Sequence, residues 1–273
     1  MSKEERIGVY EGLSNEDYHA DSALGSSSVK VVLKSLAHFK SYMSEPPKVT
    51  KALDFGTACH SAILEQDFNK YTKAPDVRRG TIAWKEHQKT HPDKILLKPD
   101  EYSSVKQMYE KFWSHKIAPK LTKLGKPEIS FFAVDPITGL RVKARADYFV
   151  RYDNKNFVVD YKTARDASDE GFAKAIWNYR YDISAAFYMY VIELATGVRP
   201  DDFIWIAQDK DPPHLINTLR APEAMITRAD ARVKHSLGLI KQAKETDIWP
   251  GYDETLREVE LDDWAIRKEE SYE

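Results

Sequence analysis

Two stretches decide the fold: Gly139-Leu-Arg-Val-Lys-Ala-Arg-Ala-Asp147 and Phe157-Val-Val-Asp160-Tyr-Lys162. Each alternates apolar and polar residues, the pattern of a β-strand whose side chains point to opposite faces in turn. Residues 152–156 lie between them and read Tyr-Asp-Asn-Lys-Asn, a turn-rich link of the length that a hairpin uses. The two stretches therefore predict an antiparallel hairpin.

Strand alternation also predicts which polar side chains lie together. On the first strand it places Lys143, Arg145 and Asp147 on one face. On the second strand it places Asp160 and Lys162 on one face. We therefore expect Asp147, Asp160 and Lys162 to meet on one surface at the end of a twisted hairpin.

Two acids beside a lysine suit the hydrolysis of a phosphodiester. Mg²⁺ takes oxygen ligands and keeps several waters, so one or two carboxylates and a substrate phosphate are enough to hold it. The metal lowers the pKa of a bound water, and two metals about 3.5–4 Å apart can also clamp the leaving oxygen. The lysine can orient the water or neutralise developing charge. The alternative is that Asp147 and Asp160 flank turns and Lys162 is a solvated partner, because an isolated Asp-x-Lys triplet is common.

Composition limits the classes of protein and partner. Of the 273 residues, 42% are hydrophobic and 12% aromatic, which indicates a globular protein with a core. The 41 Lys and Arg nearly balance the 43 Asp and Glu, so a DNA partner would need a local basic patch. The single cysteine, Cys59, excludes an internal disulfide and a cysteine-rich zinc or iron–sulfur site. Without a signal-peptide core or a membrane-length apolar run, we expect a soluble cytoplasmic protein that makes no membrane contact.

The rest of the chain predicts helices before the hairpin and both helices and strands after it. Helical spacing of apolar residues marks the segments 29–42, 51–64, 100–121, 169–196 and 222–244. Strands are expected at 128–134, 203–207 and 214–219, residues 8–20 are expected to be extended, and 75–99 reads as a polar surface excursion with a short helix near 84–89. This order predicts an α+β fold with a central mixed β-sheet flanked by helices.

The same pattern predicts one domain over residues 1–273. It would have an N-terminal helical elaboration at about 1–125, a catalytic core at about 126–246 and an acidic tail at about 247–273.

Two residues outside the hairpin could complete a metal site. His60, in the predicted helix 51–64, would add a nitrogen ligand and favour Mn²⁺ alongside Mg²⁺, although a lone histidine on a helix is more often a core or boundary residue. Glu128 begins a predicted strand and could supply an oxygen as an auxiliary ligand, or it could be only an acid at the edge of the strand.

Other polar residues could bind substrate. Basic residues cluster by sequence around the acids, as a phosphate-guiding cleft requires: Lys143, Arg145, Lys162 and Arg165. Ser184 and Tyr188 are four residues apart and so are neighbours on one face of the helix predicted for 169–196. Tyr188 could face a DNA strand, although most aromatic residues of this helix suit the core better.

Several blocks along the chain resemble a known nuclease family. They are Ser14-Asn-Glu-Asp-Tyr-His19, Leu24-Gly-Ser-Ser-Ser28, Asp54-Phe-Gly-Thr-Ala-Cys-His60, the two hairpin stretches and Tyr181-Asp-Ile-Ser-Ala-Ala-Phe-Tyr188. In this order they are similar to the blocks of RecE-type exonucleases (exodeoxyribonuclease VIII-like), in the RecB-like branch of the PD-(D/E)xK nuclease superfamily. The resemblance covers most of residues 8–219 and leaves out 75–99 and the acidic tail.

The resemblance implies a restriction-endonuclease-like core and a Mg²⁺-dependent exonuclease, with Mn²⁺ expected to substitute. Such enzymes degrade linear duplex DNA from 5′ ends and leave 3′ single-stranded tails for homologous recombination. By resemblance, Lys162, Asp160 and Asp147 would be catalytic, and the metal ligands would be His60, Asp147, Asp160 and the main-chain carbonyl of Tyr161. It also implies a RecT-like single-strand annealing partner and a homo-oligomeric ring, in a phage or prophage protein that acts in the cytoplasm of a bacterial host cell.

One position departs from the family pattern. The RecB-like branch usually has Gln-x-x-x-Tyr after the lysine, whereas this chain keeps Tyr188 but has Ser184 in place of the glutamine. Serine is shorter, so a contact with DNA or the active site would be shortened or lost. Two alternatives stay open: a structure-specific or restriction-type endonuclease on the same core, and a non-catalytic DNA-binding scaffold.

Overall fold

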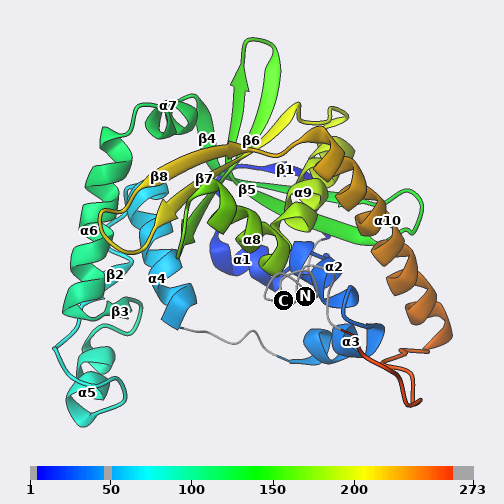
Figure 1. Cartoon of the computed structure of the whole chain (residues 1–273), viewed down its shortest axis with the longest axis horizontal. Helices are drawn as coiled ribbons and strands as arrows, with labels where there is room; N and C mark the ends of the chain where they lie inside the picture. Colours follow the sequence, from blue (N-terminus) through cyan, green and yellow to red (C-terminus); the bar gives the residue numbers. More distant parts are fainter. Residues whose placement is uncertain (1–4, 46–50, 261–273) are drawn as a thin grey trace, which may run out of the picture.

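The protein is built on one six-stranded sheet, seen in a computed structural model that describes residues 5–45 and 51–260 (Figure 1). The strand order is β1-β4-β5-β6-β7-β8. The strands are β1 (Gly8–Tyr10), β4 (Gly125–Val134), β5 (Arg141–Tyr152), β6 (Lys155–Ala164), β7 (Asp202–Asp209) and β8 (Ile216–Arg220). Only the β6–β7 pairing is parallel among these neighbours, so the sheet is mixed, as predicted.

β5 and β6 form the predicted hairpin. Its turn residues, Asp153 and Asn154, have φ values of 50° and 59°. Positive φ at both central residues gives the turn that matches the right-handed twist of the strands, and Asp and Asn tolerate it better than most residues. The tip extends beyond its neighbours, since the pairing with β4 ends at Val150 and the pairing with β7 at Phe157 (Figure 1, top).

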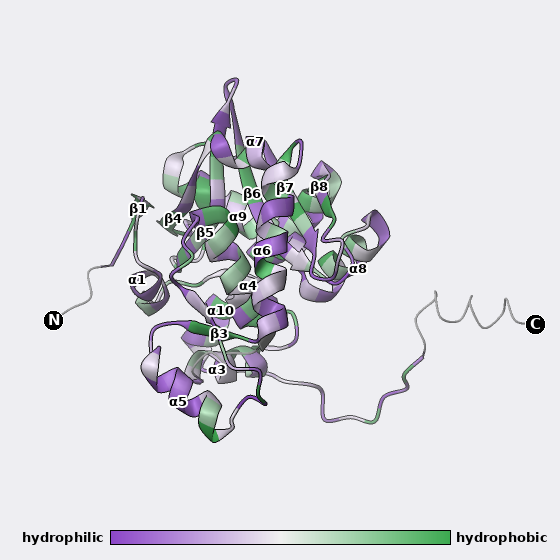
Figure 2. Cartoon of the chain, turned by 90° about the vertical axis from the view of Figure 1, so that its left-hand side faces the viewer, coloured by the Kyte–Doolittle hydropathy of each residue, from purple (hydrophilic) through white to green (hydrophobic). Residues whose placement is uncertain are grey.

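Helices cover both faces of the sheet, which confirms the predicted fold class (Figure 1). One face carries α2 (Ser26–Val32), α3 (Leu36–Ser44), α8 (Asp169–Tyr179), α9 (Tyr181–Thr196) and α10 (Glu223–Thr246). The other carries α4 (Lys51–His60), its continuation η1 (Ser61–Glu65), α6 (Pro99–Ser114) and α7 (Ala118–Lys123). Each face has its own apolar core, centred on Phe187 and Trp205 in the first and on Phe112 and Tyr161 in the second. The strands mix hydrophobic and hydrophilic residues (Figure 2), and their buried apolar side chains are shared between the two cores, in keeping with this double cover.

Three helices predicted as continuous are broken. The segment 169–196 divides at Arg180, which has a left-handed backbone (φ 53°, ψ 50°). The segment 29–42 divides before Ser35, whose hydroxyl accepts a hydrogen bond from the His38 N–H at 3.1 Å and starts α3. The segment 100–121 divides at the junction between α6 and α7. Apolar spacing passes over such short breaks, because capping and left-handed residues leave the periodicity almost unchanged.

The N-terminal region and the polar excursion hold more structure than predicted. Residues 8–20 contain β1 and a short helix, α1 (Asn15–Ala20), instead of being wholly extended. The excursion contains the expected helix, α5 (Ile82–Thr90), in which hydrophilic residues outnumber hydrophobic ones (Figure 2). It also contains a small parallel pair, β2 (Tyr71–Lys73) and β3 (Ile95–Leu97), that the sequence did not predict. Residues 261–273 of the acidic tail lie outside the described residues.

No helix within the described ranges combines the length and the apolar character that crossing a membrane would require.

Candidate active site

β4 and β5 lose their pairing at a single position, where Glu128 lies opposite Asp147. On either side the ladder continues, with Ala146 and Tyr148 both paired to β4. Glu128 has a φ of 52°, a left-handed backbone that is uncommon outside glycine and that clusters at functional sites. The backbone strain therefore coincides with the acid that the sequence suggested only as an auxiliary ligand.

The side-chain alternation of β5 changes phase at the same position. Ala144 and Ala146 face the core beneath α9, but so does Phe149, whereas Tyr148 joins the opposite core. A regular strand would place Tyr148 and Ala146 on one face. Asp147 thus lies at an irregular step in the strand, and the regular alternation that was predicted for β5 does not continue through this step.

β5 and β6 also separate at this point. Their pairing ends at Tyr148 and Val159. Beyond it, the Tyr161 N–H donates to Asp147 Oδ2 at 2.7 Å instead of to a strand partner. A cleft of about 1180 Å³ opens here, and its lining includes Asp147, Tyr161 and Lys162. We call this separation of the two strands the fork.

Three potential metal ligands meet at the fork. His60, Glu128 and Asp147 each offer a ligand atom, and these atoms lie within 4.8 Å of one another. His60 Nε2 lies 2.8 Å from Asp147 Oδ2, and His60 Nδ1 lies 3.7 Å from Glu128 Oε1. No other group of three such residues is this close within residues 5–45 and 51–260. Two carboxylates with one imidazole are donors that suit Mg²⁺ or Mn²⁺.

The protonation of this cluster is set by burial and by mutual charge. Burial alone would lower the pKa of His60, but the charge and hydrogen bond of Asp147 raise it. Burial alone would raise the pKa of Asp147, but the charge and hydrogen bond of His60 lower it. For Glu128, burial and the Asp147 charge outweigh the opposing charges of His60 and Arg145 and raise its pKa to about 7. The raised pKa of Glu128 shows that its ionisation is disfavoured beside Asp147, and a cation bound here would oppose that shift.

Asp160 and Lys162 form a second charged pair beside the cluster. Lys162 Nζ lies 2.6 Å from Asp160 Oδ2, and Asp160 is 5% exposed. Burial raises the pKa of Asp160, the Lys162 charge opposes this, and the net shift is upward. Burial would lower the pKa of Lys162, but the charges of Asp160 and Asp147 raise it, so the lysine stays protonated. The structure thus brings Asp147, Asp160 and Lys162 together, with Asp160 engaged by the lysine.

The predicted substrate residues divide into two groups. Tyr188 and Arg165 line the cleft, whereas Ser184 and Lys143 are not among its lining residues. Lys143 is buried, and its Nζ donates to the carbonyl oxygens of Tyr18 at 2.6 Å and of Asp21 at 2.7 Å. Both bonds tie α1 to the sheet, so the expectation that Lys143 guides phosphate is not supported.

Arg145 reaches the wall of the cleft, but its donors are already used. Its guanidinium donates to Ser130 Oγ and to the Leu13 carbonyl, both at 2.9 Å. Its Nη1 also lies 3.6 Å from Glu128 Oε2. Arg145 is 9% exposed, so it supports the N-terminal segment and Glu128 more directly than it offers charge to a substrate.

Sequence reasoning missed several residues in the cleft and next to it. Lys210, just after β7, lines it together with the α8–α9 residues Tyr179 and Tyr181. Lys30 of α2 lies 5.6 Å from the Tyr181 ring centroid, and burial, with the nearby Lys162 charge, lowers the pKa of Lys30 to about 8. Two signals were available, the Tyr181–Tyr188 block for Tyr181 and the Ser26-Ser-Ser28 block close to Lys30, whereas Lys210 comes from a segment with no distinguishing motif.

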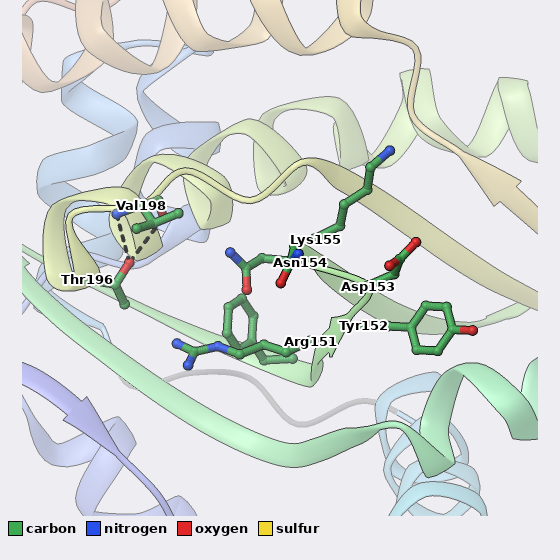
Figure 3. A pocket seen from close by; sticks show the side chains of 9 residues that line it. Arg151, Tyr152, Asp153, Asn154, Lys155, Thr196 and Val198 are labelled. Carbon is green, nitrogen blue, oxygen red and sulfur yellow. Dashed lines mark hydrogen bonds between the residues drawn. The ribbon is translucent and has the colours of Figure 1, made fainter.

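A second, smaller cavity lies at the hairpin tip and has a different character. It measures about 410 Å³ and is lined by Arg151–Asn156 together with Phe149, Thr196 and Val198. The side chains of Lys155, Asp153 and Tyr152 point away from one another, and none converges on a common point (Figure 3). With one carboxylate, this cavity lacks the chemistry found at the fork.

Comparisons with known proteins agree with this geometry. The sequence matches the family described as "PDDEXK-like domain of unknown function (DUF3799)" over residues 25–259. No curated protein matches the sequence. Among solved structures, a "Putative exonuclease" from Eubacterium rectale superposes with a TM-score of 0.64 at 13% identity, covering 94% of this chain and 98% of that chain. The structure of SSO0001 superposes with a TM-score of only 0.29 at 15% identity, over 76% of this chain and 84% of that chain, which is too low to indicate a shared fold.

Proposed function

The chain belongs to the PDDEXK-like family DUF3799, and on that premise we propose that it is a metal-dependent exonuclease of linear double-stranded DNA. The observation that carries the proposal is the fork itself. It places a cluster of three potential metal ligands beside a half-buried, protonated lysine, in a cleft open to solvent. The likeness of fold to the Eubacterium rectale protein is in keeping with this activity.

The residues at the fork fit a divalent cation. His60, Glu128 and Asp147 would hold it, and Glu128 thereby gains a central role that the sequence left open. The Tyr161 carbonyl suits the role implied by resemblance, because the N–H and C=O of a strand residue point to the same neighbour and this N–H points at Asp147. Asp160 would join the ligands by releasing Lys162. When bound, Mg²⁺ or Mn²⁺ supplies an activated water and neutralises charge on the phosphate.

Lys162 acts as a fixed cation in this proposal. Its raised pKa excludes it as a proton acceptor near neutral pH, so it stabilises negative charge that develops on the attacked phosphate. Asp160 orients it at 2.6 Å before substrate binds. Tyr188, whose hydroxyl is hydrogen-bonded to the Ser26 side chain and whose pKa burial raises, stays neutral and can donate to a substrate oxygen.

The finer features rest on the resemblance to RecE-type exonucleases. They are digestion from 5′ ends, 3′ single-stranded products, cooperation with a RecT-like annealing protein and a homo-oligomeric ring. Arg165 and Lys210 support a DNA substrate independently, because both line the cleft and can face a phosphate backbone.

The test is digestion of linear and covalently closed circular duplex DNA with Mg²⁺. We expect loss of the linear DNA only, abolished by a chelator and by Asp160→Ala. Asp153→Asn, an acid in the exposed turn of the same hairpin, is the matched control and should digest normally.

Other outcomes would replace the proposal. Nicking of the circles would show an endonuclease on this core. Intact linear DNA, combined with metal-independent binding to it, would show a DNA-binding scaffold.

A further inference from the structure

The break between α8 and α9 presents an aromatic ring to the cleft. Arg180 has a left-handed backbone, and its guanidinium donates to both carboxylate oxygens of Asp182, at 3.0 and 2.8 Å. This clamp fixes the bend between Tyr179, the last residue of α8, and Tyr181, the first residue of α9. Two rings two residues apart would diverge on a continuous helix, but here they stack.

The stack connects the catalytic lysine with the outer part of the cleft. Lys162 Nζ lies 5.6 Å from the centroid of the Tyr181 ring. The Tyr181 and Tyr179 rings are stacked, with centroids 5.6 Å apart and planes inclined by 29°. Tyr181 also contacts Phe172, which is fully buried, so the inner ring of the stack is held in place. The Tyr181 ring therefore lies between Lys162 and Tyr179, and it supports the Tyr179 ring from one side.

Tyr179 is exposed to solvent inside the cleft, not on the outer surface of the protein. It is 60% exposed, yet it lines the same cleft as Asp147 and Lys162. Trp177, two residues earlier and 65% exposed, does not line the cleft and instead lies beneath Arg180, whose guanidinium carbon is 5.2 Å from its ring. The two exposed aromatic residues thus separate into one inside the cleft and one outside it.

A flat, exposed ring beside a phosphate-binding cation suits a nucleobase. Bases stack on aromatic side chains with little regard to sequence, because every base has a π-face. Within an intact duplex both faces of each base are covered by its neighbours. The ring can therefore accept only a base at a duplex end or one that has left its partner.

From these contacts we propose that Tyr179 is a stacking platform for an unpaired or terminal nucleobase close to the phosphate at Lys162. The inference rests on the proposed function, since it assumes that DNA enters this cleft, and it adds the part of the substrate that the outer cleft recognises. Base stacking there would hold one strand of a DNA end while its phosphate lies at the fork.

The experiment measures equilibrium binding of blunt duplex DNA, with a chelator present so that no hydrolysis occurs. The probes are an intact duplex and duplexes that carry one abasic residue, placed in turn at each of the three terminal nucleotides of each strand. We expect Tyr179→Ala to weaken binding of the intact duplex about tenfold, within the range for one base stacked on an aromatic ring. At one of the abasic positions, the wild type should bind about tenfold more weakly than it binds the intact duplex. Tyr179→Ala should bind that abasic duplex with the same affinity as the wild type does, because the base on which Tyr179 stacks is missing.

Two variants separate stacking from structure. Tyr179→Phe keeps the ring and should bind as the wild type does, whereas Tyr179→Leu keeps bulk but should lose affinity. Trp177→Ala, the matched exposed aromatic outside the cleft, should leave every affinity unchanged.

Some results would overturn the platform. They are unchanged binding by Tyr179→Ala, or an equal loss for the intact duplex and for all the abasic duplexes. Failure of the proposed function looks different, because base-dependent binding would remain in a protein that digests no linear DNA with Mg²⁺. If the wild type digests linear DNA normally but the effect of Tyr179→Ala does not depend on any base, the stacking platform is wrong and the proposed nuclease function stands.

Discussion

The two ends of the β5–β6 hairpin use similar residues for opposite purposes. At the tip, Arg151, Asp153 and Lys155 are exposed, and their side chains point apart into solvent (Figure 3). At the fork, Asp147 and Asp160 are buried, and their neighbours shift their pKa values. The strand pairing is regular at the tip and interrupted at the fork. The separation of the two strands, more than the residue types, therefore creates the site.

The largest expected contrast is between the two aspartates of the hairpin. Asp147→Asn removes a charge that holds the cluster together and should lower the nuclease rate by about 10³-fold, comparable to losing a key electrostatic group in other enzymes. Asp153→Asn should leave the rate within about twofold. Initial rates on linear DNA, at saturating Mg²⁺, measure both, and a similar loss in the two variants would break the comparison.

Next comes a contrast between two lysines of β6. Lys162→Met should lower kcat by about 10²–10³-fold, because the protonated amine at the phosphate is lost. Mn²⁺ affinity, measured by calorimetry, should persist because His60, Glu128 and Asp147 remain. Lys155→Met at the tip should change neither quantity, and full activity of Lys162→Met would remove the lysine from the mechanism.

A third contrast concerns stability and the arginines of β5. Arg145→Met leaves Ser130 and two carbonyls without their donor inside the protein, and should lower the free energy of unfolding by about 3 kcal/mol. Arg151→Met at the tip should change it by less than about 0.5 kcal/mol. Urea unfolding followed by circular dichroism compares them, and equal stabilities would contradict the supporting role assigned to Arg145.

The smallest effect concerns pH. The pKa of Glu128 is raised to about 7 without metal, so below that pH a bound proton competes with the cation. Mn²⁺ affinity should therefore rise with pH, by up to about tenfold per unit below pH 7 for this one proton, and release of the His60 proton, whose pKa is also raised, adds to the rise. Glu128→Gln should weaken binding and flatten this part of the slope. Calorimetry between pH 6 and 8 measures it, and an unchanged slope in the variant would assign the proton elsewhere.

Much of the fold followed from apolar periodicity. The hairpin, the mixed sheet and most of the helices were predicted, because alternation and helical spacing record which side chains are buried. The break at Arg180 was missed because one left-handed residue, held by Asp182, barely alters that spacing. The pair β2–β3 was missed because its strands have three residues each.

The site was predictable only in part. The sequence identified Asp147, Asp160, Lys162 and His60 as candidates, but it assumed a regular strand and so put Lys143 near the cleft. The place of Glu128 in the cluster depends on its left-handed backbone and on the missing strand pair opposite Asp147. No local sequence pattern predicts either feature. The resemblance to RecE-type exonucleases suggested the nuclease activity, whereas the arrangement of the ligands became clear only from the pairing of the strands.

The most direct test of the fork as the metal centre is anomalous diffraction from crystals grown with Mn²⁺. We predict one strong peak, or a close pair, within coordination distance of His60, Glu128 and Asp147. A peak confined to the hairpin tip, or none at the fork in well-ordered crystals, would contradict the account.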